Sequence, residues 1–178
     1  RAEKDADFLE TYNDTVSKSR NTLNALDQMI GDARIERDRI VIPKGGRRPH
    51  GGFEGVVGAG IPGVRFIQGT QAAGFDALLE QVQGGAFLQA FRDLRGGGSI
   101  TQIEGEKATT ALTRIKRAQS EIEFVKAARE FAEILRNGVK NADKRYTRLT
   151  GEAPEVAPTQ RKTPTSKLSP ATRAKYGL

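Results

Sequence analysis

A glycine-rich stretch, GVVGAGIPG at residues 55–63, has the spacing of a phosphate-binding loop. Gly58, Gly60 and Gly63 form the pattern G-x-G-x-x-G, in which small residues let the backbone approach a pyrophosphate. That chemistry also needs a buried strand before the glycines and a helix that begins on them. Here glycine is frequent before the pattern, Pro62 lies inside it, and no helical periodicity follows. We therefore interpret the stretch as a loop without a bound cofactor.

Residues that carry catalysis or bind metals are scarce. The 178 residues include no cysteine and a single histidine, His50, which excludes thiolate metal sites and argues against a histidine-based triad. The acidic residues of the predicted helices lie at helix starts or on polar faces, where they favour the helix dipole and solubility. We therefore expect no enzymatic activity and no metal site.

Basic residues are the side chains whose distribution indicates binding. The net charge is +7, from 29 Lys and Arg against 22 Asp and Glu, and such a balance favours anionic partners. The excess lies mostly in segments without a helical pattern, where a solvated surface is the alternative interpretation. Few aromatic residues accompany it, so we expect phosphate contacts rather than base recognition. The candidate contact residues are Arg34, Arg37, Arg39, Lys44, Arg47, Arg48, Arg161, Lys162, Lys167, Arg173 and Lys175.

The composition limits the hydrophobic core. Apolar residues make up 37% of the chain and tryptophan is absent, so a sizeable core is expected only if part of the chain stays outside it. No apolar run approaches the ~18–20 residues of a membrane span, and we expect a soluble protein.

Residues 1–31 are predicted to form one long amphipathic helix that ends at Gly31. The apolar residues of this helix form a narrow stripe along one face, which is typical of a seam against another helix rather than of burial in a large core. Its apolar residues recur at helical spacing: Phe8, Tyr12, Val16, Leu23, Leu26 and Ile30.

Residues 32–69 are expected to form a basic, glycine-rich loop. Nine glycines and two prolines lie between Lys44 and Gly69, and glycine supplies no packing surface. Ile40, Val41 and Ile42 form either a short strand or an anchor for the loop. Loops of this length are usually functional or disordered.

Residues 70–148 are predicted to form a small helical bundle. Gly84 and Gly85 mark either a bend in one helix or the junction of two. Gly105 is a weak point in a helix or a place of close approach. The predicted core consists of Phe75, Leu78, Leu79, Phe87, Phe91, Leu94, Leu112, Ile115, Phe124, Phe131 and Leu135.

Two capping boxes are predicted to begin the later helices of this bundle. They are T-x-x-E at Thr101–Glu104 and S-x-x-E at Ser120–Glu123. The first helix is expected to carry Ile103 on its apolar face with Ala108, and the second to end near Tyr146.

Residues 149–178 are rich in proline and lysine and are expected to form an extended tail. The predicted fold class is therefore all-α: a long N-terminal helix, a glycine-rich loop, a small helical bundle and an extended basic C-terminal tail. We expect the bundle to be stable alone and the flanking segments to gain order on partners.

Residues 66–124 resemble a recurrent block in proteins of tailed bacteriophages and prophages. The block begins with G-T-x-A-x-x-F, continues with AFLQAF and GGG-x-I-T-x-x-EG-x-KA, and closes with AQSE. The resemblance implies a virion protein, either an internal or ejection protein or a tail or neck component, and it carries over no catalytic residue. Matching residues are Gly69, Thr70, Ala72, Phe75, Ala86 to Phe91, Gly96 to Gly98, Ile100, Thr101, Glu104, Gly105, Lys107, Ala108 and Ala118 to Glu121.

The leading hypothesis is a virion protein that assists genome delivery and contacts other virion subunits, such as portal, tail or neck proteins. In this hypothesis the protein also binds viral duplex DNA without sequence specificity. The resemblance implies a symmetric homo-oligomer located in the capsid or tail, and in the host cell envelope during infection. One alternative is a purely architectural neck, tail or adaptor protein. An enzyme whose catalytic domain precedes Arg1 is a third class.

Overall fold

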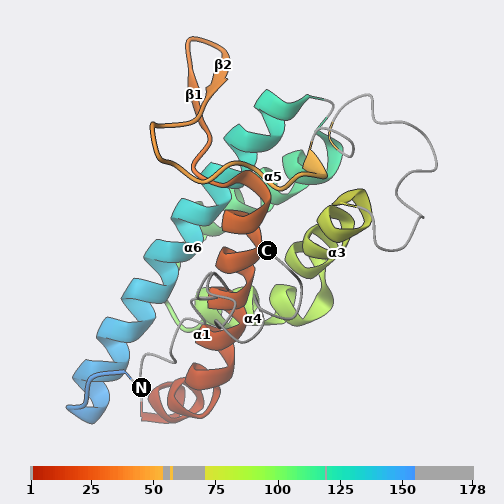
Figure 1. Ribbon diagram of the computed structural model, residues 1–178. Coiled ribbons are helices and arrows are strands. Elements are labelled where there is room, and N and C mark those ends of the chain that lie inside the picture. Colours follow the sequence, from red (N-terminus) through yellow and green to blue (C-terminus); the bar gives the residue numbers. More distant parts are fainter. Residues whose placement is uncertain (1, 54–56, 58–70, 119, 155–178) are drawn as a thin grey trace, which may run out of the picture.

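Helices account for nearly all regular structure in the computed structural model, which describes residues 2–53, 57, 71–118 and 120–154 (Figure 1). The all-α prediction and the long N-terminal helix are confirmed. A short antiparallel hairpin is the exception among the described residues. The elements are α1 (Ala2–Ile30), β1 (Arg34–Glu36), β2 (Arg39–Val41), α3 (Gln71–Gln83), α4 (Gly85–Gly96), α5 (Gln102–Arg117) and α6 (Glu121–Thr150).

Helix α1 is a central part of the core and packs against α3, α4 and α6. Figure 1 shows α1 and α6 side by side, with the hairpin at the end of this pair where α6 begins. Our expectation of a narrow seam was wrong, because small and hydroxyl residues widen the buried face. The hydroxyls of Ser19 and Thr22 donate to backbone carbonyls one turn earlier, at 2.7 and 3.0 Å. These side chains are therefore buried without losing their hydrogen bonds.

The helix boundaries follow from local signals. Gly31 ends α1 with a positive φ of 55°, and Gly84 separates α3 from α4, so the glycine pair joins two helices. Both hydrogen bonds of the Thr101–Glu104 capping box are present. Ser120 caps α6 by accepting from the backbone N–H of Glu123 at 3.3 Å. Helix α6 continues to Thr150, beyond its expected end near Tyr146, and a glycine in the left-handed conformation follows.

Phenylalanines from several elements fill the core. The rings of Phe53, Phe75 and Phe124 lie 5.6 to 5.9 Å apart between centroids, and Phe131 of α6 contacts Phe87 of α4. Nine of the eleven predicted core residues are buried, and Leu78 and Leu79 are partly buried against the same cluster.

Ile103 was wrongly placed on the apolar face of α5, since it is 67% exposed. It precedes the buried Ala108 by five residues, which is about 140° around a helix of 3.6 residues per turn. The buried face of α5 begins instead at Gly105 and continues through Ala108, Leu112 and Ile115.

The first part of the glycine-rich segment is attached to the bundle. The backbone N–H of His50 donates to Met29 at 3.0 Å, and that of Asp32 donates to Arg47 at 2.9 Å. Phe53 is buried in the core. The expectation that this flank gains order only on partners was therefore wrong as far as Phe53. The remaining glycines, including Gly58, Gly60 and Gly63, lie outside the described residues.

Candidate anion-binding surface

The β1–β2 hairpin presents basic side chains on its outer face. Ile35 pairs with Ile40 across the strands, and both are half-buried against the core. Because side chains alternate between the faces of a strand, this apolar pair turns its neighbours outward. Arg34, Glu36 and Arg39 are accordingly exposed. Of the two alternatives for Ile40, Val41 and Ile42, the structure has a short strand, which contains Ile40 and Val41, and its pairing with β1 was not predicted.

The two residues at the hairpin tip adopt an unfavourable backbone conformation. Arg37 and Asp38 have φ values of 48° and 56°, as a two-residue type I′ turn requires. Such turns usually contain Asn-Gly, and a residue with a side chain costs roughly 1–2 kcal/mol in the left-handed region. The carboxylate of Asp38 accepts from Lys126 of α6 at 3.0 Å. Arg37 is exposed and forms no ion pair with any residue the structure describes.

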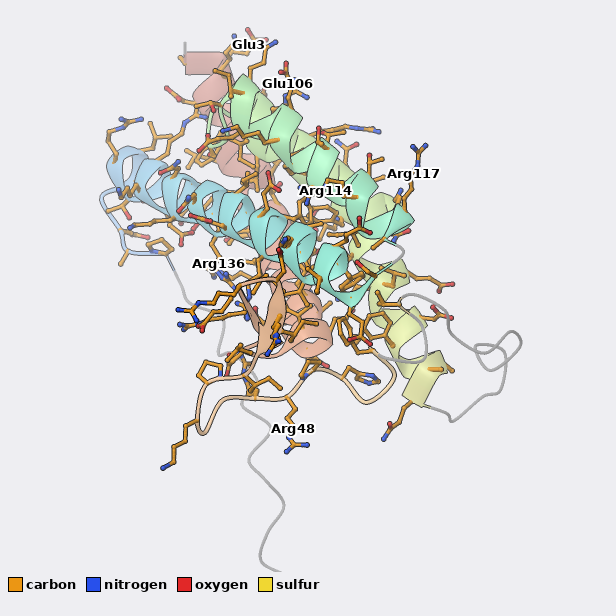
Figure 2. All side chains as sticks on the ribbon, turned by 90° about the horizontal axis from the view of Figure 1, so that it is seen from above. Glu3, Arg48, Glu106, Arg114, Arg117 and Arg136 are labelled. Atoms are coloured by element: carbon orange, nitrogen blue, oxygen red, sulfur yellow. The ribbon has the colours of Figure 1, made fainter. Side chains whose placement is uncertain are left out.

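Three more basic residues follow the hairpin. Lys44, Arg47 and Arg48 are exposed, and Figure 2 shows Arg48 extending away from the ribbon. The carboxylate of Asp32 accepts one hydrogen bond from the backbone N–H of Arg47 at 2.7 Å and another from the guanidinium of Arg47 at 3.1 Å. Both contacts lower the pKa of the Asp32 carboxyl, and the bond from the backbone N–H has the larger effect. The charge of Arg47 is therefore compensated within the chain.

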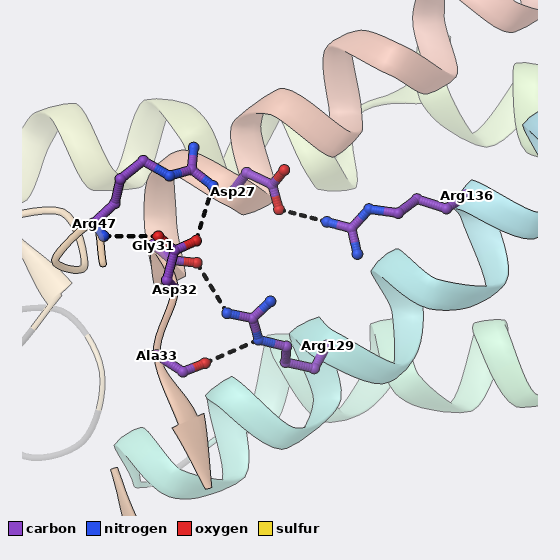
Figure 3. Close-up of polar contacts among 7 residues, drawn as sticks. All are labelled: Asp27, Gly31, Asp32, Ala33, Arg47, Arg129 and Arg136. Atoms are coloured by element: carbon purple, nitrogen blue, oxygen red, sulfur yellow. Dashed lines mark hydrogen bonds and ion pairs between the residues drawn. The ribbon is translucent and has the colours of Figure 1, made fainter. Parts of the chain in front are cut away.

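Arg129 of α6 holds the hairpin in place (Figure 3). Its guanidinium donates to the carbonyl oxygen of Ala33 at 2.9 Å and to that of Gly31 at 3.0 Å. Desolvation by burial lowers the pKa of Arg129. About two turns further along α6, Arg136 forms an ion pair with Asp27 of α1 at 2.6 Å.

Sequence reasoning missed Arg129, because a contact between residues almost a hundred positions apart leaves no local pattern. One signal was present: the carbonyls at the end of a helix need donors from elsewhere.

The structure brings the six N-terminal candidate residues together on the hairpin and the loop that follows it. Five of them, Arg34, Arg37, Arg39, Lys44 and Arg48, form what we call the hairpin basic surface. None of these five forms an ion pair among the described residues. The other candidates, Arg161, Lys162, Lys167, Arg173 and Lys175, lie outside the described residues.

His50 has a structural role in the same loop. Its Nδ1 accepts from the backbone N–H of Gly52 at 3.0 Å, and its ring lies 6.0 Å from that of Phe75. Among the described side chains, no group of three His, Asp or Glu residues is arranged to hold a metal ion.

None of the described helices combines the length and the apolar character needed to cross a bilayer.

The fold and this surface define a small helical protein with a basic hairpin. Comparison with known proteins finds no matching family model, no matching curated protein and no matching solved structure. Several described residues shared with the phage block have structural roles. Phe75, Phe87 and Ala108 are buried, whereas Thr101 and Glu104 cap α5.

Proposed function

We propose that this chain is a non-enzymatic component of a phage-like virion that binds duplex DNA through the hairpin basic surface. The observation that carries the proposal is the clustering of five exposed, unpaired basic residues on one hairpin and its adjoining loop. The resemblance of residues 66–124 to phage proteins supports the virion context. In this role the helical bundle contacts other virion subunits while the hairpin lies against the packaged genome.

Binding of this kind is electrostatic and independent of base sequence. Each phosphate that a cation neutralises releases counterions, and the logarithm of the binding constant falls with log salt by about 0.9 per contact. Five contacts therefore predict a slope of about −4 to −5. The described part of this segment has two aromatic rings, Phe53, which is buried, and His50, whose ring lies against Phe75, so single strands gain little from stacking.

A salt titration with a duplex oligonucleotide of mixed sequence tests the proposal. In the variant Arg34→Gln/Arg37→Gln/Arg39→Gln, the slope is expected to become less negative by about 3. The matched control, Lys116→Gln/Lys140→Gln/Lys144→Gln, removes three exposed charges from α5 and α6. The control should retain most of the affinity. Equal losses in both variants would show that only net charge matters, and would contradict a hairpin site.

The architectural alternative is favoured by apolar residues on the same hairpin. Val41 at the end of β2 and Ile42, which follows it, are each 37% exposed, and contiguous exposed apolar side chains mark protein interfaces when they form a large patch. If the wild-type chain binds no duplex DNA even at low salt, the hairpin is better interpreted as a contact for another virion protein. The variant Val41→Ser/Ile42→Ser would then weaken assembly while the arginine variant would not.

A further inference from the structure

A second basic surface lies at the corner between α4 and α5. An open depression of about 400 Å³ is lined there by Arg92, Arg95, Gly96, Ile100 and Gln102. Arg92 and Arg95 are three residues apart on α4 and therefore lie on the same helix face. Both are exposed, and neither forms an ion pair with any described residue. The lining contains two cations and no carboxylate.

Gly105 of α5 gives Arg95 its position. A Cβ atom built on Gly105 would lie 2.9 Å from both Cδ and Nε of Arg95. The missing side chain therefore leaves the space that the Arg95 side chain occupies across α5. A guanidinium held by packing loses less conformational entropy on binding than a freely rotating one. This explains a buried glycine inside α5, where glycine lowers helix stability.

Apolar and polar groups complete the depression. Ile100 is buried beneath it, and Ile103 on the neighbouring first turn of α5 is the most exposed of the large apolar side chains described. The amide nitrogen of Gln102 donates to Glu106 at 3.2 Å, which leaves the carbonyl oxygen of Gln102 as an acceptor. The site thus combines two cations, one acceptor and an adjacent apolar contact.

This depression lies far from the hairpin basic surface. Arg145 of α6 donates to the carbonyl oxygen of Gly97, at the end of α4, whereas Arg129 holds the hairpin. The two arginines are 16 residues apart on one helix, which is about 24 Å at 1.5 Å per residue. A partner at the depression therefore need not compete with one at the hairpin.

We propose that the depression binds an acidic segment of a partner protein. Carboxylates of the segment pair with Arg92 and Arg95, a backbone N–H donates to Gln102, and an apolar side chain covers Ile103. Charge complementarity selects the acidic groups. The exposed isoleucine favours a protein over a nucleic-acid backbone, which offers only phosphate and sugar to cover it.

The probe is an acetylated and amidated peptide of sequence Asp-Leu-Glu-Leu-Asp, titrated into the labelled chain and followed by NMR. Binding is expected to shift the side-chain N–H signals of Arg92 and Arg95 and the methyl signals of Ile103. The variant Arg92→Gln/Arg95→Gln should bind at least tenfold more weakly. The matched control Lys116→Gln/Arg117→Gln, with the same charge loss on α5, should bind as the wild type does.

Gly105→Ala separates binding from folding. Alanine favours the helix, so the melting temperature should not fall, while the displaced Arg95 should weaken peptide binding at least threefold. The proposal is overturned if the peptide produces no shifts at these residues or binds the arginine variant as tightly as the wild type. It is also overturned if the uncharged peptide Asn-Leu-Gln-Leu-Asn binds equally, or if duplex DNA shifts the same signals more strongly.

Discussion

The hydroxyl of Tyr12 donates to the carboxylate of Asp143 at 2.6 Å and joins the first helix to the last across 131 positions of the chain. Arg20 binds the other oxygen of that carboxylate at 3.0 Å. The ring of Tyr12 stacks on Tyr146 with centroids 4.2 Å apart. This contact joins α1 to α6 together with the ion pairs of Arg136 with Asp27 and of Arg145 with Asp5, and the positions of both proposed binding surfaces depend on this helix pairing.

Replacing Tyr12 by Phe should lower the free energy of unfolding by about 1.5–3 kcal/mol, because a hydrogen bond to a charged group is lost. Burial, followed by the contact with Asp143, raises the pKa of Tyr12. The folded state therefore holds the phenolic proton more tightly than the unfolded chain, whose tyrosine pKa is about 10. The stabilisation is full below about pH 10 and is lost as the pH rises above that value.

Urea unfolding of the wild type and of Tyr12→Phe at pH 8 and pH 11 measures this effect. Lysines titrate in the same range, so the informative quantity is the difference between the two proteins. That difference should shrink at pH 11. A difference that is independent of pH would contradict the raised pKa.

Gly138→Ala should destabilise the bundle. A Cβ at this position would lie 2.6 Å from Cγ1 of Ile100, which is buried. Overpacking typically costs about 1–3 kcal/mol, and the helix-propensity gain of about 1 kcal/mol offsets part of it. Gly96→Ala is the matched control, since nothing lies within 4 Å of its Cβ position. Thermal unfolding should show a lower melting temperature for the first variant and an equal or higher one for the control.

Arg129→Met should loosen the hairpin from α6. Methionine replaces the aliphatic part of the arginine side chain but leaves the carbonyls of Gly31 and Ala33 without their donor. An unsatisfied buried group costs about 1–3 kcal/mol. Arg114→Met is the control, because it removes an exposed pair with Glu130 that is worth about 1 kcal/mol or less. Hydrogen exchange should accelerate in the first variant only at the amides of Glu36 and Arg39, the hydrogen-bonded pair that flanks the two-residue turn, and unchanged protection there would refute the anchoring role.

Arg37→Asn/Asp38→Gly should stabilise the hairpin, and it should bind DNA more weakly than Asp38→Gly alone. The two new residues suit a type I′ turn and remove a conformational cost of roughly 1–2 kcal/mol at Arg37; the gain at Asp38 is smaller, because Asp visits the left-handed region more readily. Loss of the ion pair between Asp38 and Lys126, which is exposed, subtracts about 1 kcal/mol or less. Unfolding should show higher stability for the double variant than for the wild type. Its DNA affinity is compared with that of Asp38→Gly, because both variants lose the carboxylate and release Lys126. Equal affinity in the two variants would mean that Arg37 does not contact DNA.

Local signals in the sequence predicted the helices well. The bonds within Thr101–Glu104 and from the backbone N–H of Glu123 to Ser120 span three residues, so the residue types alone indicate them. The predicted core was similarly accurate, because the phenylalanines of the bundle have few other places to lie in a chain that is 37% apolar.

The remaining features depend on contacts that the sequence does not encode locally. Ser19 and Thr22 are buried because their hydroxyls donate to backbone carbonyls. Their polar residue types gave no indication of burial in the sequence. The hairpin lacks the Asn-Gly signal of its turn class, and its position depends on Arg129. The sequence did not predict the α4–α5 depression, because it depends on the packing of Arg95 against Gly105 and neither residue alone indicates that contact.

The position of α1 inside the core also determines how the chain can be divided. α1 contacts α3, α4 and α6, and most of this contact does not depend on the peptide bonds of the exposed hairpin tip. A trypsin cut after Arg37 would therefore leave two pieces joined by their buried faces. The same tip is a natural boundary for reconstituting the protein from separately produced halves.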